Sequence, residues 1–197
     1  MFPVYFPRRP RLRRDGDKYG NEATKLFKDA KQLLNEIVKN KLLNANAVVH
    51  IFPASSVGDD VEIYDLNEGA IAQVHCLRQQ IKKADYQFCL SDFIAPKDSG
   101  KQDWLGAFAV TTGIGLNKIV EEFEANDDDY NSIMAKALAD RLAEAFAEKL
   151  HELTRKQYWG YAAEENLSLE NVLKEKYYGI RPAPGYPACP DHSEKEI

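Results

Sequence analysis

The feature that most constrains this chain is a proline-rich segment near its C-terminal end. Residues 181–190 read Arg-Pro-Ala-Pro-Gly-Tyr-Pro-Ala-Cys-Pro, and they hold four of the nine prolines in the 197-residue sequence. Each proline fixes its own φ at about −65° and also restricts the residue before it. The segment is therefore predicted to be a stiff, extended loop, and neither a helix nor a central strand.

The side chains of this loop suit the capture of a small molecule. Arg181 opens it with a planar guanidinium, which suits bidentate binding of a carboxylate or phosphate. Gly185 permits close approach of another group, and Tyr186 offers a ring and a hydroxyl. A rigid loop also loses little entropy on binding. From the residues alone two interpretations remain open, a small-molecule clamp and a proline loop that packs as a wall with a surface ion pair.

The spacing of apolar residues predicts the remaining elements. Steps of three and four predict a helix over 22–43 and one long helix over about 128–158. Shorter patterns predict strands at 47–52 (ended by Pro53), 61–65, 86–94 and 104–112, and short helices at 75–83 and 168–177. Strands followed by helices predict an α+β fold, a twisted antiparallel sheet with flanking helices.

Charge and composition argue against several classes of function. The net charge of −5 disfavours nucleic acid and anionic membrane surfaces as partners, and no apolar run is long enough to span a membrane. Three irregularly spaced cysteines argue for a reducing compartment, so we expect a cytoplasmic protein. Residues 1–20 are rich in arginine and proline, and we interpret them as a divergent, poorly ordered arm rather than a nucleic-acid arm.

The sequence offers no obvious catalytic or metal-binding constellation. Cys189 and His192 have the spacing of one ligand pair, but a zinc site needs about four ligands and no second pair matches. We therefore predict no metal site. No acid–base pair stands out either, so no catalytic residue is predicted.

Five stretches of the chain, in order, resemble the S-adenosylmethionine-binding activation (reactivation) domain of cobalamin-dependent methionine synthase. They are 57–64 (VGDDVEIY), 77–80 (LRQQ), 89–96 (CLSDFIAP), 137–148 (ALADRLAEAFAE) and 179–192 (GIRPAPGYPACPDH).

The resemblance implies residue roles that physics alone does not give. It implies that Arg181 holds the carboxylate of the methionine moiety, that Ala183 contributes backbone contacts, and that Gly185 and Tyr186 belong to the S-adenosylmethionine site. It also makes Glu144 a ligand contact. Helical periodicity alone predicts that Glu144 lies on a solvated face, away from the apolar stripe that includes Leu138.

The resemblance also implies a function and partners. The domain would bind S-adenosylmethionine for reductive remethylation of inactive cob(II)alamin, in the methyltransferase that makes methionine. The implied partners are a cobalamin-binding domain, which is absent from this chain, and a flavodoxin-like electron donor or reductase. A sulfonium methyl group is already activated, so this role needs binding and aiming of the donor rather than a general base.

The resemblance is incomplete at both ends. Residues 1–20 lack the aspartate-bearing stretch that the family has before its first helix. The family's C-terminal segment with a tyrosine pair has no counterpart before Ile197. We therefore expect residues 21–197 to be a partial domain. The alternative function is a docking module for the cobalamin domain or the reductase, without ligand binding.

Overall fold

The computed structural model describes residues 18–67, 69–80, 86–190 and 192. These residues form two compact units. The helical unit comprises the described residues up to Val48 together with Ala109–Arg155, and the loop-rich unit comprises Val49–Phe108 and the described residues from Lys156 onward. Residues 1–17 of the predicted arm lie outside the described residues, so the nature of that arm stays a prediction.

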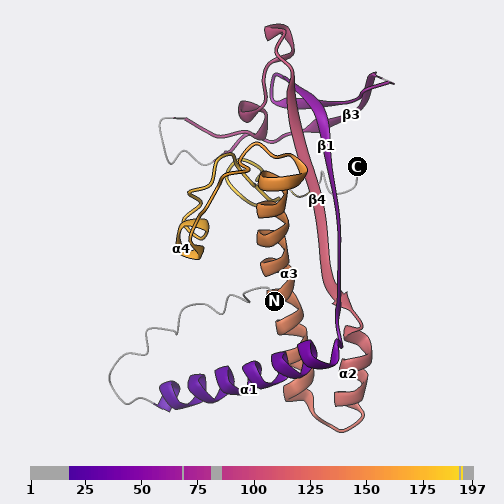
Figure 1. Ribbon diagram of the computed structural model, residues 1–197, viewed down its shortest axis with the longest axis vertical. Helices are drawn as coiled ribbons and strands as arrows, with labels where there is room; N and C mark the ends of the chain where they lie inside the picture. The colour runs from indigo at the N-terminus through magenta and orange to yellow at the C-terminus, as the bar shows by residue number, and fades with distance from the viewer. Residues whose placement is uncertain (1–17, 68, 81–85, 191, 193–197) are drawn as a thin grey trace. The chain divides into compact units, whose positions relative to one another are not determined.

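Three helices build the helical unit, namely α1 (Lys18–Asn40), α2 (Leu116–Glu124) and α3 (Asp129–Leu153) (Figure 1). Their apolar faces meet in one core, whose buried members are Leu33, Leu34, Ile37, Ile119, Met134, Ala135 and Leu138. The periodicity that predicts α1 and α3 is therefore the periodicity of this core. The helix α2 was not predicted from the sequence. All helices among the described residues are too short or too polar to cross a membrane.

The long helix has a capped start and an altered end. The Asp128 carboxylate accepts a hydrogen bond from the backbone N–H of Asn131 at 3.1 Å, so it caps the first turn of α3. The prediction of a long helix over about 128–158 is confirmed. Its last segment, Thr154–Tyr158, is a π-helix rather than an α-helix.

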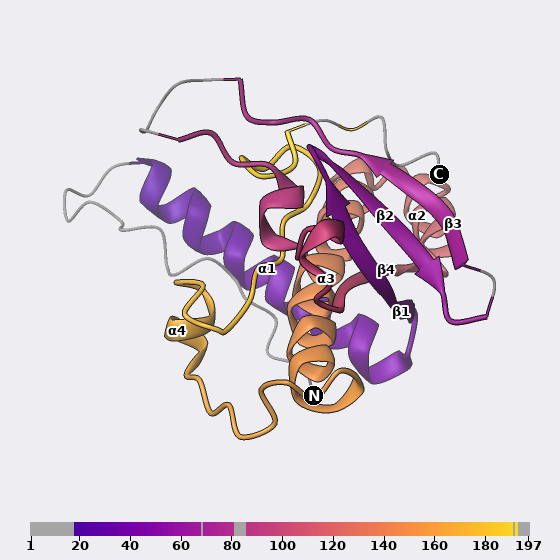
Figure 2. The ribbon, with the colours of Figure 1, turned by 90° about the horizontal axis from the view of Figure 1, so that it is seen from above.

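Four strands form one sheet in the order β3-β2-β1-β4, and Figure 2 shows β3, β2 and β1 side by side. The strands are β1 (Asn44–Val57), β2 (Asp60–Asp65), β3 (Gly69–His75) and β4 (Asp103–Ile114). β2 pairs antiparallel with both β1 and β3. The predicted α+β fold with an antiparallel sheet is confirmed, whereas β3 was not predicted.

The predicted end of the first strand at Pro53 is wrong. β1 continues through Pro53 to Val57. Pairing with β2 begins only at Ala54, opposite Ile63, so no β2 residue requires the N–H that proline lacks.

Two further predictions fail in the loop-rich unit. Residues 86–94 form no strand; they run irregularly into a short 3₁₀ helix, Leu90–Phe93, whose N-terminus is capped by Asp92. The predicted helix at 75–83 is absent over residues 76–80, and residues 81–85 lie outside the described residues. Side-chain contacts decide both segments, as described below. The predicted helix at 168–177 is real but shorter, α4 (Leu169–Val172), and the Ser168 side chain caps it.

Candidate functional site

The proline-rich loop forms one side of a pocket within the loop-rich unit. The pocket has a volume of about 230 Å³. Its lining residues are Phe88, Phe93, Glu175, Tyr177, Arg181, Pro182, Ala183, Tyr186, Pro187 and Ala188. Arg181, Ala183 and Tyr186, which were singled out from the sequence, thus lie together around one cavity. The lining combines a guanidinium and a carboxylate with four aromatic rings, which suits a ligand that is partly charged and partly flat.

The loop is not extended as predicted, because two consecutive turns fold it back on itself. The Tyr186 N–H donates to the Ala183 carbonyl at 3.0 Å, and the Cys189 N–H donates to the Tyr186 carbonyl at 2.9 Å. Pro184 and Gly185 occupy the centre of the first turn, an arrangement that suits a proline followed by a residue with positive φ. The prolines therefore stiffen tight turns rather than an extended chain.

Gly185 shapes the loop and does not line the pocket. Its φ is +98°, and a Cβ atom added there would lie 3.0 Å from Nε2 of His192. Its N–H also donates to the Cys189 carbonyl at 2.8 Å. A glycine is thus needed for the turn that presents Ala183 and Tyr186.

Glu144 lies on the solvated face of α3, as helical periodicity predicts. Its side chain is 66% exposed and forms an ion pair with Arg141 at 2.6 Å. It belongs to the helical unit, whereas every residue that lines the pocket belongs to the loop-rich unit. Glu144 is not among the residues that line this pocket, and its role as a ligand contact stays a prediction.

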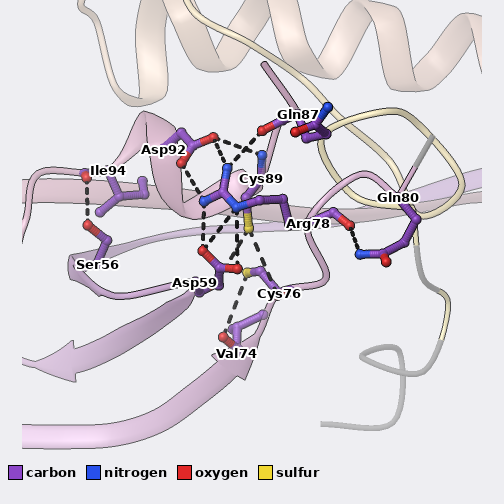
Figure 3. Close-up of polar contacts among 10 residues, drawn as sticks. All are labelled: Ser56, Asp59, Val74, Cys76, Arg78, Gln80, Gln87, Cys89, Asp92 and Ile94. Atoms are coloured by element: carbon purple, nitrogen blue, oxygen red, sulfur yellow. Dashed lines mark hydrogen bonds and ion pairs between the residues drawn. The ribbon is translucent and has the colours of Figure 1, made fainter. Parts of the chain in front are cut away.

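Two further lining residues, Phe88 and Phe93, come from the segment 86–93, here called the pocket wall. A polar network contacts this segment (Figure 3). The Arg78 guanidinium donates to Asp59 Oδ1 at 2.6 Å, to both Asp92 oxygens at 2.8 Å and to the Gln87 carbonyl at 2.8 Å. Asp92 also accepts from the Cys89 N–H at 2.9 Å. These contacts explain why the segment is irregular, since its polar groups bond to Arg78 and to each other rather than to a neighbouring strand.

Charge complementarity fixes the ionisation of this network. The Arg78 guanidinium, helped by the Cys89 N–H, holds the pKa of the Asp92 carboxyl below its ordinary value. The two aspartates in turn raise the pKa of Arg78 further. Arg78 and Asp92 therefore stay charged throughout the physiological range of pH.

Phe88 and Phe93 present an aromatic surface to the pocket. Their rings are stacked with centroids 6.1 Å apart and planes inclined by 24°. The Gln79 N–H donates to the Phe88 carbonyl at 2.8 Å, which fixes the backbone of this residue to the segment after β3. A flat heteroaromatic ring is the kind of group that stacks on such a surface.

Four pocket residues were missed by the sequence analysis: Phe88, Phe93, Glu175 and Tyr177. Phe88 and Phe93 were assigned to a strand. In a strand, successive side chains point to alternate faces of the sheet, so that assignment did not indicate a shared pocket. Glu175 and Tyr177 stand four to six residues before Arg181, so closeness in the sequence was a usable signal. The stretch 89–96, which carries part of the family resemblance, was a signal for Phe93.

Two other features were considered as candidate sites and give weaker support. A hollow of about 300 Å³ lies against α1, but one helix supplies all its lining residues, which are Lys28, Lys31, Gln32, Asn35, Glu36 and Lys39. Among the residues that the structure describes, no three His, Cys, Asp or Glu side chains are grouped so as to hold a metal ion.

Comparison with known proteins gives two matches. Residues 6–197 match the family described as "Vitamin B12 dependent methionine synthase, activation domain". A solved structure described as the MetH reactivation domain bound to AdoHcy is similar to this chain, with a TM-score of 0.85 and 54% sequence identity. The similarity covers 98% of this chain and 60% of that one, so this chain spans less than two thirds of the length of that relative.

Proposed function

The chain belongs to the family of activation domains of vitamin B12-dependent methionine synthase, and we propose that its pocket binds S-adenosylmethionine. The observation that carries this proposal is the pocket in which Arg181, Ala183 and Tyr186 meet the stacked rings of Phe88 and Phe93. AdoHcy, the ligand named for the similar structure, shares with S-adenosylmethionine a flat adenine and an amino-acid carboxylate. The pocket offers aromatic rings for the adenine and the Arg181 guanidinium for the carboxylate.

Each pocket residue has a definite role in this proposal. The Arg181 guanidinium binds the ligand carboxylate, because its fork matches two oxygens. The Ala183 carbonyl already accepts one hydrogen bond, from Tyr186, but a carbonyl oxygen has a second lone pair with which to accept from the ligand. Phe88 and Phe93 receive the adenine ring, and Tyr186 closes the side of the pocket. Gly185 acts through the turn. Glu144 stays in the proposal on resemblance alone.

We further propose that bound S-adenosylmethionine supplies the methyl group for reductive remethylation of cob(II)alamin, in a protein whose cobalamin is held by another domain. In that setting the cobalamin-binding domain and a flavodoxin-like electron donor or reductase are the partners. The residues described above bind and orient the methyl donor, and the reaction does not require them to transfer a proton. A cytoplasmic location fits such partners and stays a proposal.

Isothermal titration calorimetry with S-adenosylmethionine and AdoHcy tests the binding proposal. Arg181→Ala should weaken binding of both ligands by about tenfold to a hundredfold, as expected for losing a charged hydrogen bond. Arg181→Lys keeps the charge without the fork and should fall between the two. Lys136→Ala, which removes an exposed ion pair with Glu124 in the helical unit, is the control and should bind like the wild type.

Two results would contradict the proposal. Equal binding by the wild type and Arg181→Ala would remove Arg181 as the carboxylate anchor. No heat from the wild type with either ligand would favour the alternative, a docking module that binds partner proteins without the ligand.

A further inference from the structure

Arg78 joins the turn between β1 and β2 to the pocket wall, in addition to the hydrogen bonds that Ser56 donates to the Ile94 and Ala95 carbonyls. Asp59 lies in the tight turn between β1 and β2, which antiparallel pairing fixes up to Val57 and Asp60. Asp92 lies in the short 3₁₀ helix of the pocket wall. The Arg78 guanidinium contacts both carboxylates and therefore ties the wall to the sheet (Figure 3).

The tie acts on the pocket residues themselves. Arg78 donates to the Gln87 carbonyl, and Asp92 accepts from the Cys89 N–H, so the backbone is held on both sides of Phe88. Phe93 directly follows Asp92 in the chain. Both rings that line the pocket are thus next to atoms whose position depends on Arg78.

Regular secondary structure gives this wall little support. Apart from the 3₁₀ helix Leu90–Phe93, the described residues from 76 to 95 have no helix or strand. A guanidinium offers five donors in a fixed plane, so one side chain can bind two carboxylates and a carbonyl at once. A lysine ammonium carries the same charge but lacks the planar fork.

We propose that Arg78 is a positioning residue for the ligand pocket: it touches no ligand, but it holds the wall that carries Phe88 and Phe93 in the geometry that binds. The identity of the ligand in this inference rests on the proposed function. The effect of Arg78 on the position of the wall is independent of it.

The test compares Arg78→Met, Arg78→Lys and Lys97→Met. Lys97→Met is the matched control, because it breaks an ion pair of the same length, 2.6 Å to Glu62, in the same unit and away from the pocket lining.

Three quantities are measured: the melting temperature, the affinity for AdoHcy, and amide hydrogen exchange of peptides covering residues 86–93. Arg78→Met should weaken AdoHcy binding by about tenfold or more and should speed exchange over 86–93. Its melting temperature should fall no further than that of Lys97→Met.

Arg78→Lys should change affinity and exchange in the same direction but less, and it replaces Arg78→Met in the comparison if the latter fails to fold. Saturating AdoHcy should restore part of the protection over 86–93 in either variant. The inference is overturned if exchange over 86–93 stays as in the wild type, or if Lys97→Met changes affinity and exchange as much as the Arg78 variants do. Absence of AdoHcy binding by the wild type would reject the proposed function, and exchange alone would then decide whether Arg78 positions the wall.

Discussion

The helical unit and the loop-rich unit are stabilised in different ways. In the helical unit, side chains from α1, α2 and α3 share one apolar core. In the loop-rich unit the buried apolar cluster is smaller, formed by Ala54, Val61 and Ile94, and the pocket wall depends on Arg78 and its two aspartates. The first arrangement is stable through area removed from water, the second through directed polar contacts. The difference indicates that the helical unit supplies stability, whereas the loop-rich unit carries the binding geometry.

The largest effect should come from the helical core. Leu138→Ala removes a side chain that is 3% exposed, and it should lower the free energy of unfolding by about 2–5 kcal/mol. Chemical denaturation measures this value. Ile133→Ala on the same helix is the control, since Ile133 is 67% exposed, and it should change stability by about 0.5 kcal/mol or less. Similar losses in both variants would show that burial in the apolar core is not what stabilises the helical unit.

Gly185→Ala should lower stability less than Leu138→Ala does, and it should also weaken ligand binding. The residue has φ +98° and its new Cβ would meet His192, so we expect a loss of about 1–2 kcal/mol in unfolding free energy. The turn that presents Ala183 and Tyr186 would also shift, so calorimetry should show weaker binding of AdoHcy.

Gly100→Ala is the matched control for this substitution. Gly100 has φ +65° and nothing within 4 Å of an added Cβ, so only conformational strain remains. It should leave AdoHcy binding unchanged. If Gly100→Ala weakened binding as much as Gly185→Ala, the local role of the 183–186 turn would be wrong.

The smallest effect should come from acid. The folded-state pKa of Asp92 is lowered, so its contribution to stability is complete above the ordinary carboxyl value of 3.8 and is lost as pH falls through the folded pKa. Because Asp92 is partly exposed, solvent screens the interaction and the loss should be modest. After correction for intrinsic exchange, hydrogen exchange over residues 86–93 should stay constant from neutrality down to pH 3.8 and should rise as pH falls further.

Asp128 offers the matching measurement in the helical unit. Asn131 lowers its pKa in the same direction, so acid should loosen the start of α3 rather than the pocket wall. Asp92→Asn should abolish the acid response of 86–93 only, and Asp128→Asn that of the first turn of α3 only. A response shared by both segments in either variant would show that the two units do not open independently.

The sequence was informative wherever a regular period or a fixed backbone preference applied. The helices predicted at 22–43 and 128–158 and the strands predicted at 61–65 and 104–112 follow from local rules and are found in the structure. For the candidate site, Arg181, Ala183 and Tyr186 were identified and lie around one pocket. The wrong element types, at 76–80 and 86–94, fall in segments without regular secondary structure, and the predicted strand end at Pro53 and the extended loop at 181–190 were also wrong.

By itself, then, the sequence determined the α+β class, the core faces of α1 and α3, and the rigidity of the proline-rich loop, because each depends on neighbours within a few residues. Only the tertiary structure decided that the loop folds into two turns and that Phe88 and Phe93 line one pocket with Arg181. Arg78 reaches Asp59 and Asp92 across 19 and 14 residues of sequence. Such contacts depend on where a guanidinium fork meets two carboxylates in space, and no local pattern of residues encodes that meeting.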